Sequence, residues 1–353
     1  MENLNRRHDI DWLRVIAIGL LLIYHTAIGF QSWGLMIGFI SNKPSWNGLW
    51  APMSMLNIWR IPLLFFVAGM GVFFALQKRD WKQLIQERTK RILLPFVFGM
   101  LVIVPIHILL LQSYYGWEMK YQPSPSHLWF LGNIFIYTAI LLPLFCYLKK
   151  HKDKSIFVKF RSLLAQPIGL LIVMLLFIAE AMIIKPNPYE LYAMTVHGFV
   201  LGFLAFLCGY LFIYSGERFW KMLSRWRWIF FILALALYVF RMYKEQMGVY
   251  GLTPLYRLSI ESNLWIFALF ALAYKHLNIN SKALQYLSQS AYPIYIIHMV
   301  FIYLASYLIF PLDINMQLKY FIVVVFLFIG SFAFYEFIIR RITFLRPLFG
   351  LKK

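Results

Sequence analysis

The sequence predicts an all-α polytopic membrane protein with about ten transmembrane helices and no soluble domain. The first observation is composition, since 61% of the 353 residues are hydrophobic and only 14% are charged. Soluble domains contain about 45–50% apolar and about 25% charged residues. The second is a series of apolar runs, each long enough to cross the roughly 30 Å of hydrocarbon in a bilayer. The third is the placement of lysine and arginine, which gather in every second loop.

Ten apolar runs are recognised, and a single transmembrane domain over residues 1–353 is expected to contain them all. No small-residue cleavage site precedes the first run, so we expect it to remain as a helix rather than to be removed as a signal peptide. The seventh run is short and could extend in either direction. The runs cover residues 10–30, 53–76, 92–112, 128–148, 163–184, 196–214, 228–243, 258–274, 290–310 and 318–339.

Basic residues set the expected orientation. The two termini and the loops at 77–91, 149–162, 215–227 and 275–289 hold 25 lysines and arginines. The intervening loops, expected at 31–52, 113–127, 185–195, 241–257 and 311–319, hold 7. Because cytoplasmic loops carry the excess of Lys and Arg, this ratio predicts that both termini are cytoplasmic. It also accounts for the net charge of +20 without a nucleic-acid partner.

The first helix carries charges that a bilayer makes expensive. Residues 9–25 read DIDWLRVIAIGLLLIYH, and an ionised side chain at the helix centre costs on the order of 3 kcal/mol or more. At 100° per residue, Asp11, Arg14 and His25 share one face, with Asp11 and Arg14 close enough to pair and His25 about 16 Å further along. The less specific alternatives are that Asp9, Asp11 and Arg14 form a charged cluster at the lipid headgroups and that His25 makes only structural hydrogen bonds.

Several motifs point to one family. The pattern Ile10-Asp11-x-Leu-Arg14, ten further residues and His25 resembles the signature of the acyltransferase 3 family. Further segments match that family in order, although Val15, Ala68 and Ala291 depart from its usual residues. These segments are RIPLLFFVAGMGVFF (60–74), ERTKRILLP (87–95), SHLWFL (126–131), GYLFIYSGERFWKML (209–223), LSQSAYPIYIIH (287–298) and FYEFIIRR (334–341). SHLWFL and GYLFIYSGERFWKML are similar to the subgroup that includes the periplasmic-glucan succinyltransferases.

The resemblance implies an O-acyltransferase of the cytoplasmic (inner) membrane. Its members transfer an acyl group, commonly from cytoplasmic acetyl-CoA, to hydroxyls of extracytoplasmic glycans. Arg88 and Arg91 would bind the phosphates of acyl-CoA with guanidinium forks; a basic membrane anchor is the alternative. His25 would be the general base, because neutral imidazole accepts protons near pH 7. Asp11 and Arg14 would hold the polar face of the first helix and guide the donor.

Six other ionisable residues lie at the predicted helix ends or near the middle of the membrane. For four of them at the outer ends, the hypothesis is contact with a carbohydrate acceptor; for the other two, it is an accessory role. For each, the alternative to a functional role is a structural one, such as an ion pair, a helix cap or a hydrogen bond between helices. The acceptor candidates are His127, Arg60, Arg257 and Glu261, and the accessory candidates are His298 and Glu336.

A transporter or flippase for a polysaccharide or lipid-linked substrate is the alternative function, with the same residues lining a permeation path. Corresponding pairs of Gly/Pro-broken helices in two halves, which mark many transporters, are not found. We expect no permanently bound cofactor and no metal, and Cys146 and Cys208, both in apolar runs, indicate neither a disulfide framework nor a metal site. The partners expected are the lipid bilayer, acyl-CoA and a carbohydrate. The acceptor sugar, the acyl chain (acetyl or succinyl), direct or covalent transfer and the oligomeric state stay open.

The orientation is tested by cysteine labelling in a background with both native cysteines replaced by serine. A cysteine in place of Gln122 should react with an impermeant thiol reagent in intact cells, and one in place of Lys82 should react only after the cells are opened. The reverse pattern would invert the predicted topology.

Overall fold

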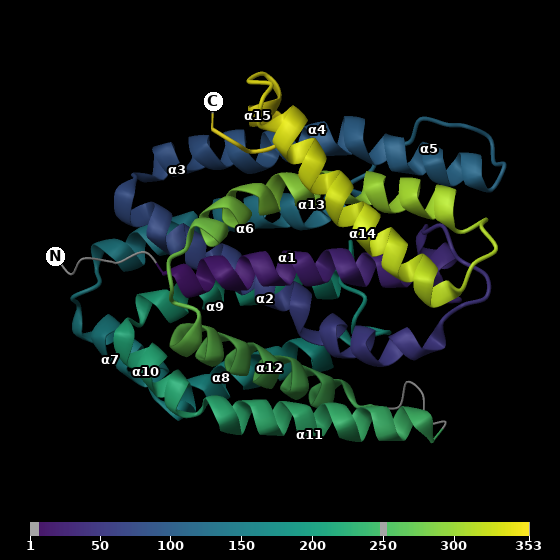
Figure 1. Ribbon diagram of the computed structural model, residues 1–353. Helices are drawn as coiled ribbons and strands as arrows, with labels where there is room; N and C mark the ends of the chain where they lie inside the picture. Colours follow the sequence, from purple (N-terminus) through teal and green to yellow (C-terminus); the bar gives the residue numbers. More distant parts are fainter. Residues whose placement is uncertain (1–6, 248–252, 353) are drawn as a thin grey trace. The chain divides into compact units, whose positions relative to one another are not determined.

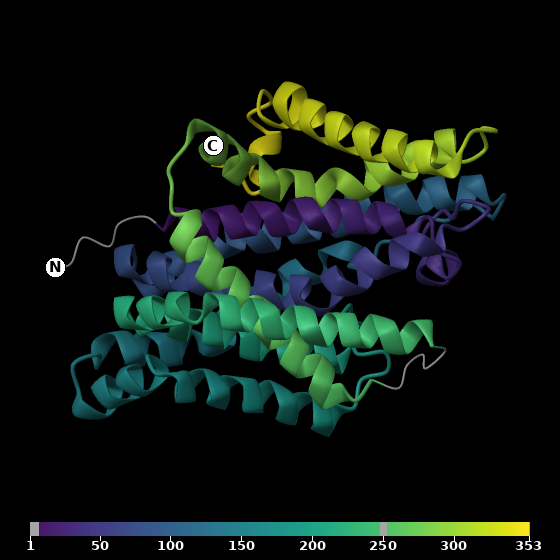
Figure 2. The ribbon, with the colours of Figure 1, turned by 60° about the horizontal axis from the view of Figure 1, so that its bottom comes forward.

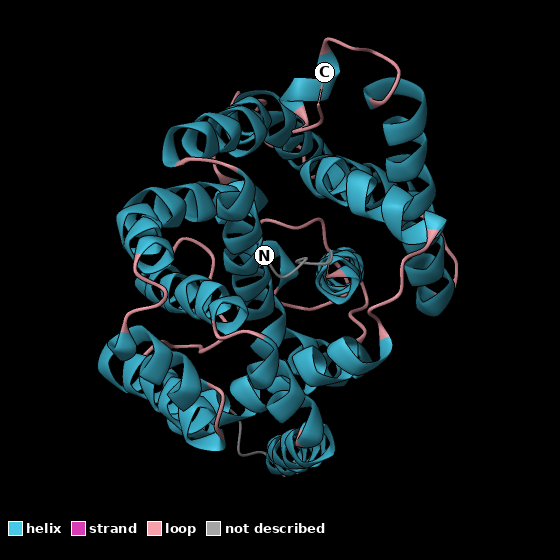
Figure 3. Cartoon of the chain, turned by 90° about the vertical axis from the view of Figure 1, so that its left-hand side faces the viewer, coloured by secondary structure: helices cyan, strands magenta, loops and turns pink. Residues whose placement is uncertain are grey.

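The computed structural model describes residues 7–247 and 253–352, and this part of the chain consists of helices and connecting loops without a strand (Figure 3). Its α-helices are α1 (His8–Ile28), α2 (Trp50–Lys78), α3 (Trp81–Arg88), α4 (Leu94–Phe98), α5 (Val104–Tyr114), α6 (Trp129–Lys150), α7 (Ser155–Leu164), α8 (Pro167–Ile184), α9 (Val196–Tyr214), α10 (Glu217–Arg225), α11 (Arg227–Gln246), α12 (Leu255–His276), α13 (Lys282–Ile309), α14 (Met316–Phe334) and α15 (Leu345–Leu348). Short 3₁₀ turns are η1 (Gly34–Ile37), η2 (Asn47–Leu49) and η5 (Ser126–Leu128), and π-turns are η3 (Thr89–Leu93), η4 (Gly99–Ile103) and η6 (Tyr335–Ile339).

The predicted class is confirmed: the chain is a multi-pass, all-helical membrane protein. Nine helices of the described part are long and apolar enough to cross a bilayer. A tenth span is added if α10 and α11, which meet at a bend of 56°, count as one. The short seventh run, 228–243, extends in both directions to become α11, so the first residues of the loop expected over 241–257 are helical. Part of the loop expected over 241–257 lies outside the described residues. The orientation of the termini stays a prediction.

The third span is interrupted by two π-turns and two prolines. Pro105 has no N–H to give to the carbonyl oxygen of Leu101, four residues earlier. The hydroxyl of Tyr121 donates a hydrogen bond to that oxygen at 2.8 Å. The loop after α5 is therefore fastened to the helix at the place where the helix loses a bond of its own.

The chain forms two compact units. Of the described residues, unit 1 takes those within Met1–Ala17, Asn57–Ile85 and Ile136–Leu284, and unit 2 takes Ile18–Leu56, Gln86–Phe135 and Gln285–Lys353. Residues of α1 up to Ala17 belong to unit 1, and those from Ile18 belong to unit 2; α1 is labelled in Figure 1.

Unit 1 is built around α12, which packs against α8, α10 and α11; α11 and α12 lie side by side in both views (Figures 1 and 2). A proline again sets a side-chain contact. Pro62 leaves the carbonyl oxygen of Ile58 without its helical partner, and that oxygen accepts hydrogen bonds from Tyr192 (3.0 Å) and Ser262 (2.8 Å). The bonds tie α12 and the loop before α9 to α2.

Helices α2 and α9 approach each other through glycines. A Cβ atom on Gly69 would overlap the carbonyl oxygen of Phe206, and one on Gly209 would overlap that of Phe66. Small residues allow membrane helices to pack backbone against backbone. These two glycines are therefore needed for close packing rather than for an unusual backbone conformation.

Unit 2 contains the loop between α1 and α2 together with α13 and α14, which lie next to each other in Figures 1 and 2. The ring of Phe301 occupies the space beside Gly330, so these two helices also meet at a glycine. The ammonium of Lys319 is buried at the start of α14. It donates hydrogen bonds to the carbonyl of Phe310 (2.7 Å) and the amide oxygen of Asn42 (3.3 Å), which fixes the 29–47 loop to the α13–α14 turn.

A matched pair of glycines on α2 tests the packing. We expect Gly69→Ala to destabilise the protein by about 1–3 kcal/mol through overpacking. Gly71→Ala, whose Cβ would meet nothing within 4 Å, should be neutral or stabilising by up to about 1 kcal/mol, because alanine is the better helix former. Thermal unfolding in detergent, followed by circular dichroism, measures both. Equal shifts in Tm would show that the α2–α9 contact is looser than described.

Candidate functional site

The polar face of α1 has the predicted pair at its first turns. The guanidinium of Arg14 donates to the carboxylate of Asp11 at 2.7 Å, so the pairing at i,i+3 is confirmed. Asp9 is fully buried and is paired with Arg7 instead. His25 lies near the other end of the same helix and is half-buried.

His25 contacts a second histidine from the far end of the sequence. Its Nδ1 lies 2.9 Å from Nε2 of His298 on α13, and the two rings stack with centroids 5.2 Å apart and planes inclined by 11°. His298 is fully buried, and its Nδ1 lies 2.7 Å from the carbonyl oxygen of Tyr295. Both histidines belong to unit 2.

His127 continues the group. It lies on η5, and its Nε2 contacts the carbonyl oxygen of Ile296 at 3.1 Å. The hydroxyl of Tyr295 donates to the carbonyl oxygen of His127, so α13 holds both the ring and the backbone of this residue. Its ring centroid is 5.0 Å from that of His298.

The sequence reasoning missed a fourth member, His107 on α5. Its ring lies 5.6 Å from that of His127 and 4.9 Å from that of Tyr303, measured between centroids. Its Nε2 is 3.5 Å from the hydroxyl of Ser126. Only a lone histidine two residues after a proline marked this position in the sequence. His25, His107, His127 and His298 are called the histidine cluster below.

A loop segment lies against the cluster. The ring of Phe39 is 5.9 Å from that of His25 and 5.7 Å from that of Tyr303, whose hydroxyl donates to the carbonyl of Gly38. Over residues 7–247 and 253–352, no set of three or more His, Cys, Asp or Glu side chains is arranged to hold a metal ion.

The donor candidates lie at the first π-turn. Arg88 ends α3, and Arg91, inside η3, is paired with Glu87 at 3.3 Å. Within the described chain, Nε of Arg91 and the hydroxyl of Tyr292 are buried without a hydrogen-bond partner. Gly350, with φ +73°, packs onto the ring of Tyr292 and the carbonyl of Arg91, and a Cβ there would overlap that ring. An anion with several acceptor oxygens would satisfy such donors.

The acceptor candidates of unit 1 have other partners than expected. Glu261 is not held by Arg257, four residues earlier, but by Arg241 of α11 through two bonds of 2.9 Å. Both side chains of this pair are buried. The guanidinium of Arg257 lies over the ring of Phe240, 4.7 Å from its centroid. Arg60 is buried on α2.

Two further acidic residues of unit 1 are Glu180 on α8 and Glu190 in the loop before α9. Glu180 accepts from Nδ1 of His197 at 2.8 Å, with both side chains buried. Burial raises the pKa of the Glu190 carboxyl in the loop before α9, against the lowering effects of its own backbone hydrogen bond and of Arg241. Glu180 and His197 thus have each other as structural partners.

Glu336, the second accessory candidate, lies on η6. It accepts two bonds from Arg340 (2.8 and 2.9 Å) and one from the hydroxyl of Tyr286 at 3.3 Å. It therefore links the last span to the start of α13, within unit 2.

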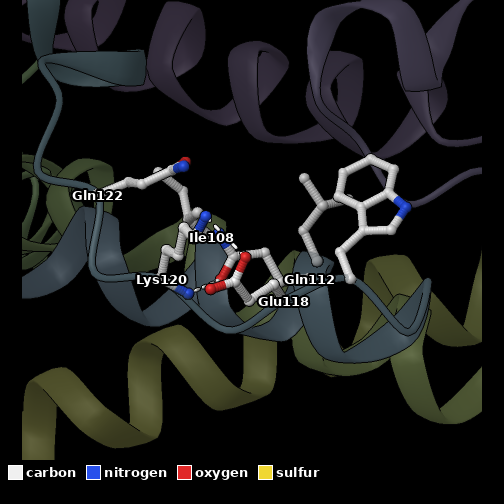
Figure 4. Close-up of a pocket in the computed structure, with 7 residues that line it drawn as sticks. Ile108, Gln112, Glu118, Lys120 and Gln122 are labelled. Atoms are coloured by element: carbon white, nitrogen blue, oxygen red, sulfur yellow. Dashed lines mark hydrogen bonds and ion pairs between the residues drawn. The ribbon is translucent and has the colours of Figure 1, made fainter.

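An open cavity of about 310 Å³ lies where α5 ends (Figure 4). Gln112 organises it, because its backbone carbonyl accepts from the N–H of Trp117 (2.8 Å) and its side-chain oxygen from the N–H of Lys120 (2.9 Å). Glu118 and Lys120 form an exposed ion pair at 2.7 Å, and Trp117 is half exposed. The lining residues are Ile108, Leu111, Gln112, Trp117, Glu118, Lys120 and Gln122.

Comparison with known proteins identifies the family. The acyltransferase 3 model, described as an acyltransferase domain, matches residues 7–336. The chain belongs to the acyltransferase 3 family. No curated protein and no solved structure matches the chain. The match includes the whole histidine cluster, the Arg88–Arg91 turn and the polar face of α1, so every candidate residue named above lies within the acyltransferase domain.

Proposed function

We propose that this acyltransferase moves an acetyl or succinyl group from cytoplasmic acyl-CoA to a hydroxyl of an extracytoplasmic carbohydrate, with His25 as general base. The hydroxyl proton passes to the imidazole, and the oxygen attacks the thioester carbonyl. The C–S bond breaks as the C–O bond forms. The imidazolium then returns the proton to the leaving thiolate, so that the products are an O-acyl ester and free coenzyme A.

The observation that carries this proposal is the position of His25 in a chain of the acyltransferase 3 family. Its ring is half-buried and is held by a hydrogen bond to a second, fully buried imidazole. A general base needs access to its substrate and a group that orients it. The charged residues of α1 are already joined in ion pairs, Arg14 with Asp11 and Asp9 with Arg7, which directly precedes the helix.

Arg88 and Arg91 support binding of the CoA phosphates on the predicted cytoplasmic side. The Nε of Arg91 and the hydroxyl of Tyr292 are buried hydrogen-bond donors without an acceptor among the described residues. Phosphate supplies several acceptor oxygens and negative charge, which suits guanidinium better than any neutral ligand. Tyr292 is thus added to the two arginines as a candidate donor-binding residue. Asp11 and Arg14 keep their proposed role beside the donor path on α1.

The cavity at the end of α5 supports entry of a carbohydrate on the opposite side. It offers one aromatic face, Trp117, beside amide, carboxylate and ammonium groups that match sugar hydroxyls. Contacts lead from it toward the base. Trp117 stacks on Tyr115, with centroids 5.2 Å apart, and the hydroxyl of Tyr115 accepts from the N–H of Ser41, two residues beyond Phe39. His127 would then contact the acceptor beside His25, whereas Arg60, Arg257 and Glu261 stay candidates on unit 1.

The first test removes the base. His25→Ala should lower acyl transfer by about 10²–10⁴-fold, the usual contribution of a general base, and leave CoA affinity and Tm near wild type. Purified protein is incubated with labelled acyl-CoAs and cell-envelope glycan, and the labelled product is identified. His151→Ala, directly after α6, is the matched control and should keep full activity.

If His25→Ala retains more than about a tenth of the transfer rate, His25 is not the base. A loss of less than about tenfold is smaller than the contribution of about 10²-fold or more expected of a general base. Export of a glycan without any acyl-CoA cleavage would instead favour a transporter.

The second test concerns the donor site. Arg91→Ala should weaken CoA binding by about 10–100-fold, which corresponds to the loss of a charged hydrogen bond of about 1.5–3 kcal/mol. The difference from wild type should shrink as salt rises, because screening weakens only the attraction that the charge provides. Tyr292→Phe should have a smaller effect in the same direction.

Isothermal titration calorimetry with CoA measures these affinities. Lys82→Ala, an exposed charge on α3, is the matched control for general electrostatic attraction. Equal losses in Arg91→Ala and Lys82→Ala would show that the arginine acts only through the net charge of the loop.

A further inference from the structure

The hydrogen bonds around His298 restrict where its proton lies. A carbonyl oxygen only accepts hydrogen bonds, so Nδ1 of His298, 2.7 Å from the carbonyl of Tyr295, carries a hydrogen. In a neutral imidazole the other nitrogen is then a lone-pair acceptor. Nε2 of His298 therefore accepts, and the hydrogen in its 2.9 Å contact with Nδ1 of His25 belongs to His25.

The same logic extends to His25. With both rings neutral, a hydrogen on Nδ1 of His25 leaves Nε2 as its basic nitrogen. We infer that His298 is a positioning residue that holds His25 in the Nδ1-protonated tautomer and so presents Nε2 to the acceptor hydroxyl. The catalytic role in this inference rests on the proposed function, whereas the assignment of the tautomer rests only on the hydrogen bonds.

Further contacts of α13 restrain the orientation of His298 and of its neighbour His127. The ring of Tyr295 lies 5.9 Å from that of His298, and its hydroxyl is anchored on the carbonyl of His127. The next carbonyl, of Ile296, accepts from Nε2 of His127. Successive carbonyls of α13 thus orient two imidazoles, and the stacking of His25 on His298, inclined by 11°, adds a steric restraint.

The consequence appears when His25 takes up a proton. The new hydrogen is on Nε2, and the resulting imidazolium donates from Nδ1 to the lone pair of His298. That acceptor is in place before the reaction, because the bond to Tyr295 has already oriented the ring. Without it, His25 could rotate or adopt the other tautomer, and its basic nitrogen would face away from the acceptor hydroxyl.

The first experiment reads the tautomer directly. Protein labelled with ¹⁵N-histidine is studied by NMR in nanodiscs without substrate, and the His25 signals are assigned by their loss in His25→Gln. We expect the Nδ1–H, Nε2-unprotonated form in wild type and a mixture of tautomers in His298→Met. A wild-type His25 in the Nε2–H form would overturn the inference, whatever the protein catalyses.

The second experiment separates positioning from packing. His298→Met keeps bulk but removes the acceptor, and should lower kcat by about 10–100-fold, as loss of an orienting partner does, without changing KM for acyl-CoA. His298→Gln retains an acceptor oxygen within reach of His25 and should recover most of the loss. His151→Met is the control for a histidine substitution outside the cluster.

Equal losses of kcat in His298→Gln and His298→Met at equal Tm would show that the hydrogen bond to His25 has no role. Should neither variant fold, the NMR measurement on wild type still decides the tautomer. Should the protein transfer no acyl group at all, the proposed function fails, and the tautomer can still be established.

Discussion

The hydrocarbon of a bilayer offers no hydrogen-bond partner, so a buried polar group in a membrane helix must find one inside the protein. This constraint decides most of the specific contacts in the two units. The carbonyl of Ile58, freed by Pro62, is taken by two hydroxyls. The carboxylate of Glu261 is held by the guanidinium of Arg241. In unit 2, His127 and His298 are held by carbonyls of α13, and His25 is held by His298.

The two units meet this requirement with different chemistry. In unit 1 the buried groups include ion pairs, such as Arg241–Glu261, in which each charge fixes the other. Breaking such a pair is strongly destabilising, because it leaves a buried charge without compensation. In the histidine cluster the partners are other imidazoles, carbonyls and a hydroxyl. An imidazole can gain or lose a proton near neutral pH, so the cluster suits a proton transfer better than a guanidinium–carboxylate pair does, and unit 1 has one comparable imidazole pair, His197–Glu180.

The sequence patterns predict features within one helix, but they do not predict contacts between helices. Apolar run length defines a span, and the step of 100° per residue placed Arg14 beside Asp11 within one helix. Neither pattern tells which helix lies next to which. Arg257 and Glu261 have the spacing of a pair, yet Arg241 of the neighbouring α11 reaches Glu261 instead. The partner of His25 is 273 positions away in the sequence. Helical periodicity also assumes α-turns, so the π-turn that carries Arg91 was not foreseen.

Unequal burial within the His25–His298 pair fits a division of work between the rings. A base has to touch its substrate, and His25 is only half-buried, beside a loop whose Phe39 ring lies against it. A group that sets the orientation of the base has the opposite requirement, since exchange of its hydrogen bond with water would release the ring. His298 is fully buried and bonded on both ring nitrogens. In the proposed mechanism Asp11 and Arg14, paired at the start of α1, would lie beside the donor path, and His25 near its end would accept the proton of the acceptor hydroxyl.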